Sequence, residues 1–128
     1  MIPTLSVAQK LFIKEGHTVL SIHAPKNYPA LLGELPQDSK LMTKASARVD
    51  AIHFFAHSRK YLEAHAPKLK GQLKPNGLIW IMYHKGTSKV KTDVNRDTLH
   101  AYAKTIGLDG VSLISIDQDR SAMRFKVM

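Results

Sequence analysis

Short apolar runs alternate with stretches of helical periodicity along this 128-residue chain. Residues 17–23, 50–57 and 78–83 are short and rich in β-branched or aromatic side chains, so they predict strands. The run 50–57 carries apolar residues on both of its faces, which is typical of a central parallel strand that is covered on both sides. Residues 41–43 give a weaker strand signal.

Helical spacing fills the intervals between these runs. Leu5, Ala8 and Phe12 fall on one face of a first predicted helix. Pro67 lies inside the next helical stretch, and because proline costs ~3 kcal/mol in a helix interior, we expect either a kink or two shorter helices there, with Pro67 at the start of the second. A further helix is predicted over about residues 93–106.

The end of the chain has a different pattern. Residues 111–116 and 122–127 alternate between apolar and polar positions around a polar turn, which predicts an antiparallel hairpin. Strands that alternate with helices before it predict a parallel sheet. We therefore expect one α/β domain over residues 1–128, with a mostly parallel Rossmann-like sheet, helices on both faces and a C-terminal hairpin.

Composition narrows the class of protein. The chain contains no cysteine, which excludes disulfides, thiolate catalysis and cysteine-ligated zinc. No apolar run approaches the ~20 residues of a membrane span, and the first residues lack the pattern of a signal peptide, so a cytoplasmic protein is expected. The net charge of +9 favours anionic partners, including nucleic acid, although no nucleic-acid-binding motif is present.

Two resemblances support the fold. Residues 73–81 resemble the element of class I methyltransferases in which a helix leads through a Pro-x-Gly turn into a strand, and the closing hairpin is similar to theirs. The chain as a whole resembles a family of short, uncharacterised bacterial proteins, a domain-of-unknown-function family with a pared-down methyltransferase-like layout. That family has no established activity, so the resemblance implies a fold rather than a function. The segments that carry it are residues 24–28, 30–33, 53–59, 91–97 and 121–125.

The methyltransferase resemblance also sets requirements for a cofactor. It implies glycines after the first strand, where the backbone approaches S-adenosylmethionine, and an acidic residue at the end of the second strand for the ribose hydroxyls. This chain has residues 24–26, Ala-Pro-Lys, at the first place and residues 42–44, Met-Thr-Lys, at the second. We therefore recognise no cofactor site and do not expect S-adenosylmethionine to bind.

An anion site is predicted instead. Ligands of open parallel sheets bind beyond the carboxyl ends of the strands, and the loop 85–92 there is rich in lysines and hydroxyls before a helix N-terminus. The alternative is a solvated loop in which Thr92 or Asp93 caps the helix. Tyr28 has two interpretations as well, stacking on a ligand or packing against its helical neighbours. The candidate ligand-binding residues are Lys26, Tyr28, Lys85, Ser88, Lys89, Lys91 and Thr92.

Three histidines, His23, His57 and His84, each end a predicted parallel strand. Three converging imidazoles can hold a catalytic zinc ion. Histidines at strand ends are also common surface donors, and these three have no local spacing signal. They are weak candidates for metal ligands.

These observations predict a binding or regulatory module for a ligand that carries phosphate or carboxylate, without catalysis. The alternative is an enzyme, either a divergent small S-adenosylmethionine-dependent methyltransferase or a metal-dependent hydrolase. A basic nucleic-acid binder is the third interpretation. Strand edges allow a homodimer, and no membrane partner is expected.

Overall fold

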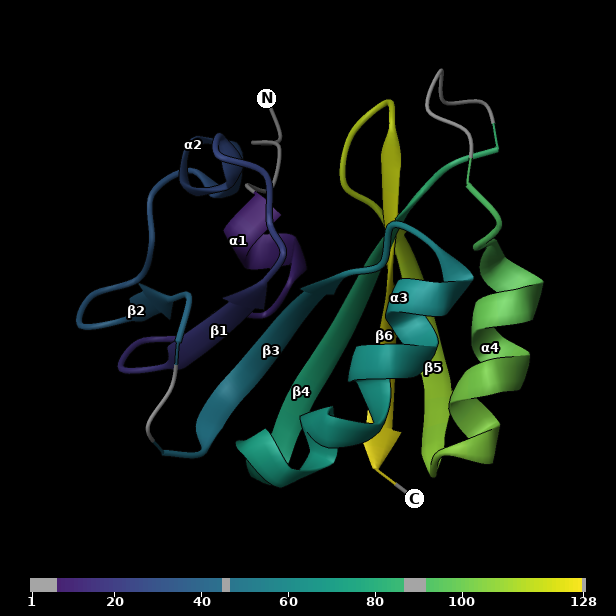
Figure 1. Cartoon of the computed structure of the whole chain (residues 1–128). Coiled ribbons are helices and arrows are strands. Elements are labelled where there is room, and N and C mark those ends of the chain that lie inside the picture. Colours follow the sequence, from purple (N-terminus) through teal and green to yellow (C-terminus); the bar gives the residue numbers. More distant parts are fainter. Residues whose placement is uncertain (1–6, 45–46, 87–91, 128) are drawn as a thin grey trace.

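The computed structural model describes residues 7–44, 47–86 and 92–127. A single six-stranded sheet in the order β2-β1-β3-β4-β6-β5 runs through it (Figure 1). The first four strands in this order are parallel, and β6 is antiparallel to both β4 and β5. The strands are β1 (Thr18–Ile22), β2 (Lys40–Met42), β3 (Val49–Phe55), β4 (Leu73–His84), β5 (Leu108–Ser115) and β6 (Arg120–Val127).

Helices cover both faces of the sheet. Two very short helices, α1 (Val7–Lys10) and α2 (Tyr28–Leu32), lie on one face, which we call the α1–α2 face. The other face, the α3–α4 face, carries α3 (Arg59–His65), the 3₁₀ helix η1 (Ala66–Gln72) and α4 (Arg96–Thr105). Each face has its own hydrophobic core. The predicted fold class is confirmed, including the parallel centre, the hairpin and the central position of β3.

The strand order reverses between β1 and β3. Strand β1 leads outward to β2, and the chain then returns across β1 to place β3 on its other side. In open α/β sheets a ligand binds at the carboxyl ends of the strands at such a switch point. The fold therefore directs attention to residues just after β1 and β3.

Strand β4 differs from the prediction. The sequence 74–77 was expected to form a turn before the strand, but β4 already begins at Leu73, which pairs with Val49. The register then shifts, so that Leu78 pairs with Ala51, and the intervening residues bulge out of the ladder. Gly77 is required in this bulge, because a Cβ atom there would lie 2.6 Å from the Leu73 side chain.

The helices also refine the expectation. Pro67 does divide its segment, since α3 ends at His65 and η1 follows with Pro67 in its first turn. The described part of the first helix is a single turn, and Phe12 lies beyond it with a positive φ of 59° and 45% of its surface exposed. The prediction that Phe12 lies on a face of this helix was therefore wrong. None of the helices within the described ranges is long and apolar enough to cross a membrane.

Candidate functional site at the carboxyl edge

Aromatic and imidazole rings gather where β1 and β3 end. We call this end of the sheet, at which the parallel strands have their carboxyl termini, the carboxyl edge. The ring of His23, directly after β1, lies edge-to-face with that of His57, with 4.3 Å between centroids. Tyr61 on α3 lies 4.5 Å from His23 and 4.2 Å from His65, one helical turn further on. The Tyr61 ring also stacks on the ring of Phe54 in β3. We call His23, His57, Tyr61 and His65 the ring cluster.

The backbone of His23 explains how the cluster forms. Its φ is 59°, in the left-handed region that glycine adopts without strain and that histidine adopts more readily than most residues. The chain thus turns at the end of β1 as a glycine would turn it, although a side chain is present. The carbonyl oxygen of His23 lies 3.3 Å from Nε2 of His57, which joins the ends of the two strands.

Burial and neighbouring charge lower the pKa of two of the strand-end histidines, His23 and His84. Partial burial lowers the pKa of His23, and the nearby His57 and His65 lower it further. At the end of β4, burial lowers the pKa of His84, with Arg120 and His57 acting in the same direction. Both imidazoles are therefore neutral at neutral pH and able to accept a proton or a hydrogen bond.

A tie between two loops fixes the end of β3. The Thr92 hydroxyl donates to the carbonyl oxygen of His57 at 2.8 Å and accepts from the Val94 amide. One Asp93 carboxylate oxygen accepts from the Arg59 amide at 2.8 Å, and so caps α3 together with Ser58. Helix α4 is capped by Asn95 in a capping box with Thr98. The expectation that Thr92 or Asp93 caps α4 was wrong, because both bind the turn after β3.

A hollow of about 360 Å³ lies beside the ring cluster on the α3–α4 face. The connection from β2 to β3 is short, residues 43–48, whereas parallel strands are usually joined through a helix of a dozen or more residues. The hollow has an apolar floor that includes Leu20 and Ile22 of β1, and Thr43 stands on its rim at the end of β2. Its other lining residues are Lys44, His65, Lys68, Leu69 and Gln72.

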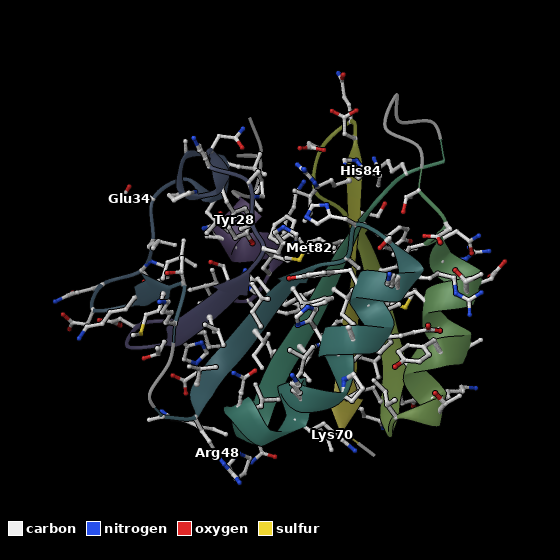
Figure 2. The ribbon with its side chains drawn as sticks, viewed as in Figure 1. Tyr28, Glu34, Arg48, Lys70, Met82 and His84 are labelled. Carbon is white, nitrogen blue, oxygen red and sulfur yellow. The ribbon has the colours of Figure 1, made fainter. Side chains whose placement is uncertain are left out.

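The predicted anion-binding residues do not form one site among the described residues. Tyr28 is 1% exposed and its hydroxyl lies 2.5 Å from Nδ1 of His53, so it packs in the core and offers no surface to a ligand (Figure 2). Thr92 is used in the loop tie, and Lys85 donates to the Ser115 hydroxyl at 2.6 Å. Lys26 is exposed on the loop before α2. Ser88, Lys89 and Lys91 lie outside the described residues.

The three strand-end histidines are close but are not arranged as metal ligands. Over residues 7–44, 47–86 and 92–127, no group of three or more histidines and carboxylates has the geometry to hold a metal ion. His57 and His23 instead meet through their rings, and Nε2 of His57 faces the His23 carbonyl oxygen. The prediction of a metal-dependent hydrolase has no support in this arrangement.

The sequence missed Tyr61, His65 and Thr43 as members of the site. Tyr61 and His65 are four residues apart on one helix face, a spacing typical of ordinary packing. Thr43 was considered only as the residue that stands where an acidic one was required. Thr43 and Lys44 line the hollow from the short connection between β2 and β3, which the sequence does show as the interval between the strand signals 41–43 and 50–57.

Solved structures share this fold over nearly the whole chain. The complex of DhpI with S-adenosylhomocysteine superposes with a TM-score of 0.67 at 12% identity, over 95% of this chain and 82% of that one. An S-adenosylmethionine-dependent methyltransferase from Aquifex aeolicus gives 0.67 at 14% identity, covering 95% and 88%. A TehB-like S-adenosylmethionine-dependent methyltransferase from Corynebacterium glutamicum gives 0.63 at 12% identity, covering 98% and 89%.

At these identities the likeness shows the fold, which is that of class I methyltransferases. No protein-family model and no curated protein sequence matches the chain, so membership of a particular uncharacterised family stays a prediction.

These matches correct the expectation about the cofactor. We did not expect S-adenosylmethionine because the glycines and the acidic residue are missing, yet the structures that share the fold are S-adenosylmethionine-dependent enzymes, some of them in complex with it or its product. Requiring those glycines and that acidic residue was too strict a criterion. A residue other than glycine can adopt the turn after β1, as the positive φ of His23 shows.

Proposed function

We propose that the carboxyl edge of the sheet binds S-adenosylmethionine and that the protein is a small methyltransferase. The observation that carries this proposal is the hollow beside the switch point, with its apolar floor and with Thr43 at the end of β2. A pocket of a few hundred Å³ with few polar groups around an apolar floor is typical of small-molecule sites. The solved methyltransferases of the same fold support the choice of ligand.

The chemistry of the lining residues fits an adenosyl group. The Leu20 and Ile22 side chains would contact the base, and the Thr43 hydroxyl would replace the missing carboxylate as a hydrogen-bonding partner for the ribose. The exposed ammonium group of Lys26, after β1, would pair with the carboxylate of the methionine part. Pro25 removes one backbone donor from this loop.

When bound, S-adenosylmethionine supplies an electrophilic methyl group. The chain's own contribution to transfer is a proton acceptor near the edge. His84 has a lowered pKa, so its imidazole is neutral at neutral pH and suited to take a proton from an oxygen or nitrogen acceptor. A hollow of about 310 Å³ beyond β4 would hold the acceptor, and its lining includes Ser121 together with Tyr83 and Lys85, the chain neighbours of His84.

Titration with S-adenosylhomocysteine tests the proposal, with calorimetry and thermal unfolding as readouts. A ligand at 100 times its dissociation constant stabilises the folded state by about 2.7 kcal/mol. We expect binding by the native chain and binding about tenfold weaker for Thr43→Val, which loses one ribose hydrogen bond. The matched control is Thr18→Val, the same change on β1 at the opposite edge of the sheet. Absence of binding, or equal weakening in both variants, would contradict the proposal.

A further inference from the structure

The opposite end of the sheet, at which the parallel strands begin, carries a basic pocket. At this edge β3 and β4 begin and β6 ends, and a hollow of about 620 Å³ opens between them. We call it the amino-edge pocket. Five of its lining residues are cationic, and the described residues that line it include no carboxylate. They are Arg48, Lys70, Lys74, Arg124 and Lys126.

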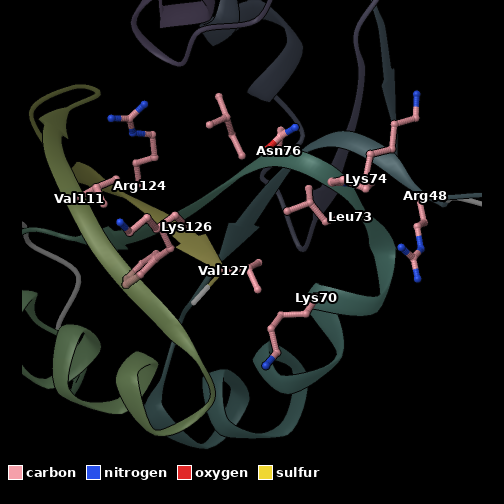
Figure 3. A pocket seen from close by; sticks show the side chains of 13 residues that line it. Arg48, Lys70, Leu73, Lys74, Asn76, Val111, Arg124, Lys126 and Val127 are labelled. Atoms are coloured by element: carbon pink, nitrogen blue, oxygen red, sulfur yellow. The ribbon is translucent and has the colours of Figure 1, made fainter.

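These cations come from four separate segments of the chain. Figure 3 shows Arg48, Lys70 and Lys74 along one side of the pocket and Arg124 and Lys126 along the other. Arg48, Lys70, Lys74 and Lys126 are exposed, so water and salt weaken their mutual repulsion without removing it. Folding brings like charges together here, and an anion bound between them would relieve the repulsion.

Arg124 adds a more specific feature. Its Nε atom is buried and, within the described part of the chain, has no hydrogen-bond partner. A buried donor without a partner is costly, and structures usually satisfy such a group with a protein atom, water or a ligand. The guanidinium carbon lies 5.2 Å from the centroid of the Phe12 ring, which holds the side chain in place.

A second hollow of about 390 Å³ extends the basic surface. It shares Lys74, Arg124 and the β4 bulge with the amino-edge pocket and adds Lys14 and His17. Its one carboxylate is Asp50, which lies 3.4 Å from Lys74 and accepts a hydrogen bond from the Thr18 amide. Burial alone would raise the pKa of Asp50, but this hydrogen bond and Lys74 outweigh it and lower the pKa. The acid is therefore paired, and the cations still outnumber it.

We propose that the amino-edge pocket binds a compact ligand with two or more linked phosphate groups. Its cations stand on opposite sides of the hollow, an arrangement that suits several anionic groups better than one. Its volume is within the range of small-molecule sites. Guanidinium and ammonium groups in such a ring form charge-assisted hydrogen bonds with phosphate oxygens. The site is separate from the carboxyl edge and does not depend on the function proposed for that edge.

The same phosphate chemistry occurs in free oligophosphates, in nucleotides and in nucleic-acid backbones, so the test uses one probe of each kind. Inorganic tripolyphosphate, adenosine triphosphate and a single-stranded oligonucleotide are titrated into the full chain at physiological ionic strength. Amide chemical shifts and calorimetry report binding. We expect tripolyphosphate and the nucleotide to bind with shifts at the start of β4 and the end of β6, while adenosine without phosphate gives no shifts at these two places.

Matched charge variants locate the site. Lys70→Gln/Lys126→Gln removes two cations from the rim, and loss of two charge-assisted hydrogen bonds is expected to weaken tripolyphosphate binding about tenfold or more. The control Lys60→Gln/Lys104→Gln removes the same charge from exposed positions on α3 and α4 and is expected to change affinity by less than about twofold. Arg124→Lys keeps its charge but loses Nε, and is expected to bind more weakly than the native chain.

Three results would overturn the proposal. One is the absence of binding by tripolyphosphate and by the nucleotide. Another is equal weakening in the two double variants, which would reduce the effect to net charge. The third is an oligonucleotide that binds more tightly than either small probe through the same residues, which would make this edge a nucleic-acid surface. The unfolding midpoints of the free variants show in each case whether the fold is retained.

Discussion

The two faces of the sheet are built from different kinds of contact. On the α3–α4 face, Leu62, Leu69 and Leu99 from the helices pack on Ile79 and Ile81 of β4. On the α1–α2 face the helices are much shorter, and the core there depends on side chains that are large but partly polar. Trp80 donates from Nε1 to the Leu11 carbonyl oxygen at 3.0 Å, and the Tyr28 hydroxyl shares a hydrogen bond with Nδ1 of His53.

The comparison shows two ways to complete one sheet. The longer helices of the α3–α4 face stabilise the fold through buried apolar side chains, and this contribution depends little on pH. The α1–α2 face has little helix to offer, so buried rings with hydrogen-bonding groups fix its loops in place. That face also holds the loop from β1 to α2, which carries Lys26 of the candidate site. We therefore expect the α3–α4 face to set overall stability and the α1–α2 face to make it sensitive to pH.

The largest expected effect is on the apolar face. Leu62→Ala removes a side chain that is 1% exposed, and the cavity left behind should lower the free energy of unfolding by about 2–5 kcal/mol. The loss should be the same at pH 7 and pH 5 within error, because the substitution changes the partner of no titratable group. Urea unfolding measures it, with Lys60→Ala on the exposed side of α3 as the control. A loss below about 1 kcal/mol would contradict the division between the faces.

The next effect is the response of the polar face to acid. Complete burial lowers the pKa of His53 to about 3, whereas an unfolded histidine titrates near 6.5. The unfolded chain therefore binds a proton that the folded one refuses, so stability is complete above pH 6.5 and falls as the pH drops below it. The expected slope is about 1.4 kcal/mol per pH unit between about pH 6 and pH 4.

A double variant isolates the His53 contribution. His23 and His84 also have lowered pKa values and contribute with the same sign, so the slope of the native chain is not diagnostic by itself. Tyr28→Phe/His53→Leu replaces both hydrogen-bonding partners by apolar groups, which can be nearly neutral at pH 7. We expect unfolding of this variant to lose most of the acid dependence. An unchanged slope would show that His53 is protonated in the folded state.

The sequence could predict the sheet but only part of this asymmetry. Runs such as 50–57 have the length and composition of buried strands. The local pattern was therefore enough to predict the strands and the central position of this one. Partners distant in sequence did not. Tyr28 and His53 meet only in the folded chain, and Asp93 caps α3 because the loop after β4 folds back on it.

The candidate sites show the same limit. His23 was recognised as the end of a strand, but its positive φ has no sequence signal in a residue other than glycine. The amino-edge pocket gathers Arg48, Lys70, Arg124 and Lys126 without any spacing that marks them as a group. The loop 85–92 did have a local signal, its run of lysines, and the prediction followed it. Among the described residues, the fold does not bring the predicted ones together at one site.

A smaller effect distinguishes the hydrogen bond from the bulk of the ring. Tyr28→Phe keeps the aromatic packing against Phe55, at 4.8 Å between centroids, and leaves Nδ1 of His53 without its hydrogen-bond partner. A buried polar atom without a partner costs about 1–3 kcal/mol, so the unfolding free energy at pH 7 should fall by that amount. Burial raises the pKa of Tyr28, so its hydroxyl stays protonated and the loss should not vary up to pH 9. A single variant as stable as the Tyr28→Phe/His53→Leu chain would contradict a hydrogen bond that stabilises this face.

The smallest effect lies at the rim where the polar face meets the carboxyl edge. The Arg120 guanidinium lies 5.6 Å from the centroid of the Phe55 ring, and its charge also helps to lower the pKa of His84. Arg120→Gln should cost about 0.5–1 kcal/mol of stability from the lost cation–π contact. It should also raise the pKa of His84 toward its ordinary value without reaching it, because burial remains the larger cause. Imidazole proton shifts followed over a pH titration measure this change, and the pKa of the distant His100 serves as the internal reference. If the pKa of His84 stayed unchanged, Arg120 would not act on the imidazole to which the proposed methyltransferase mechanism assigns the proton.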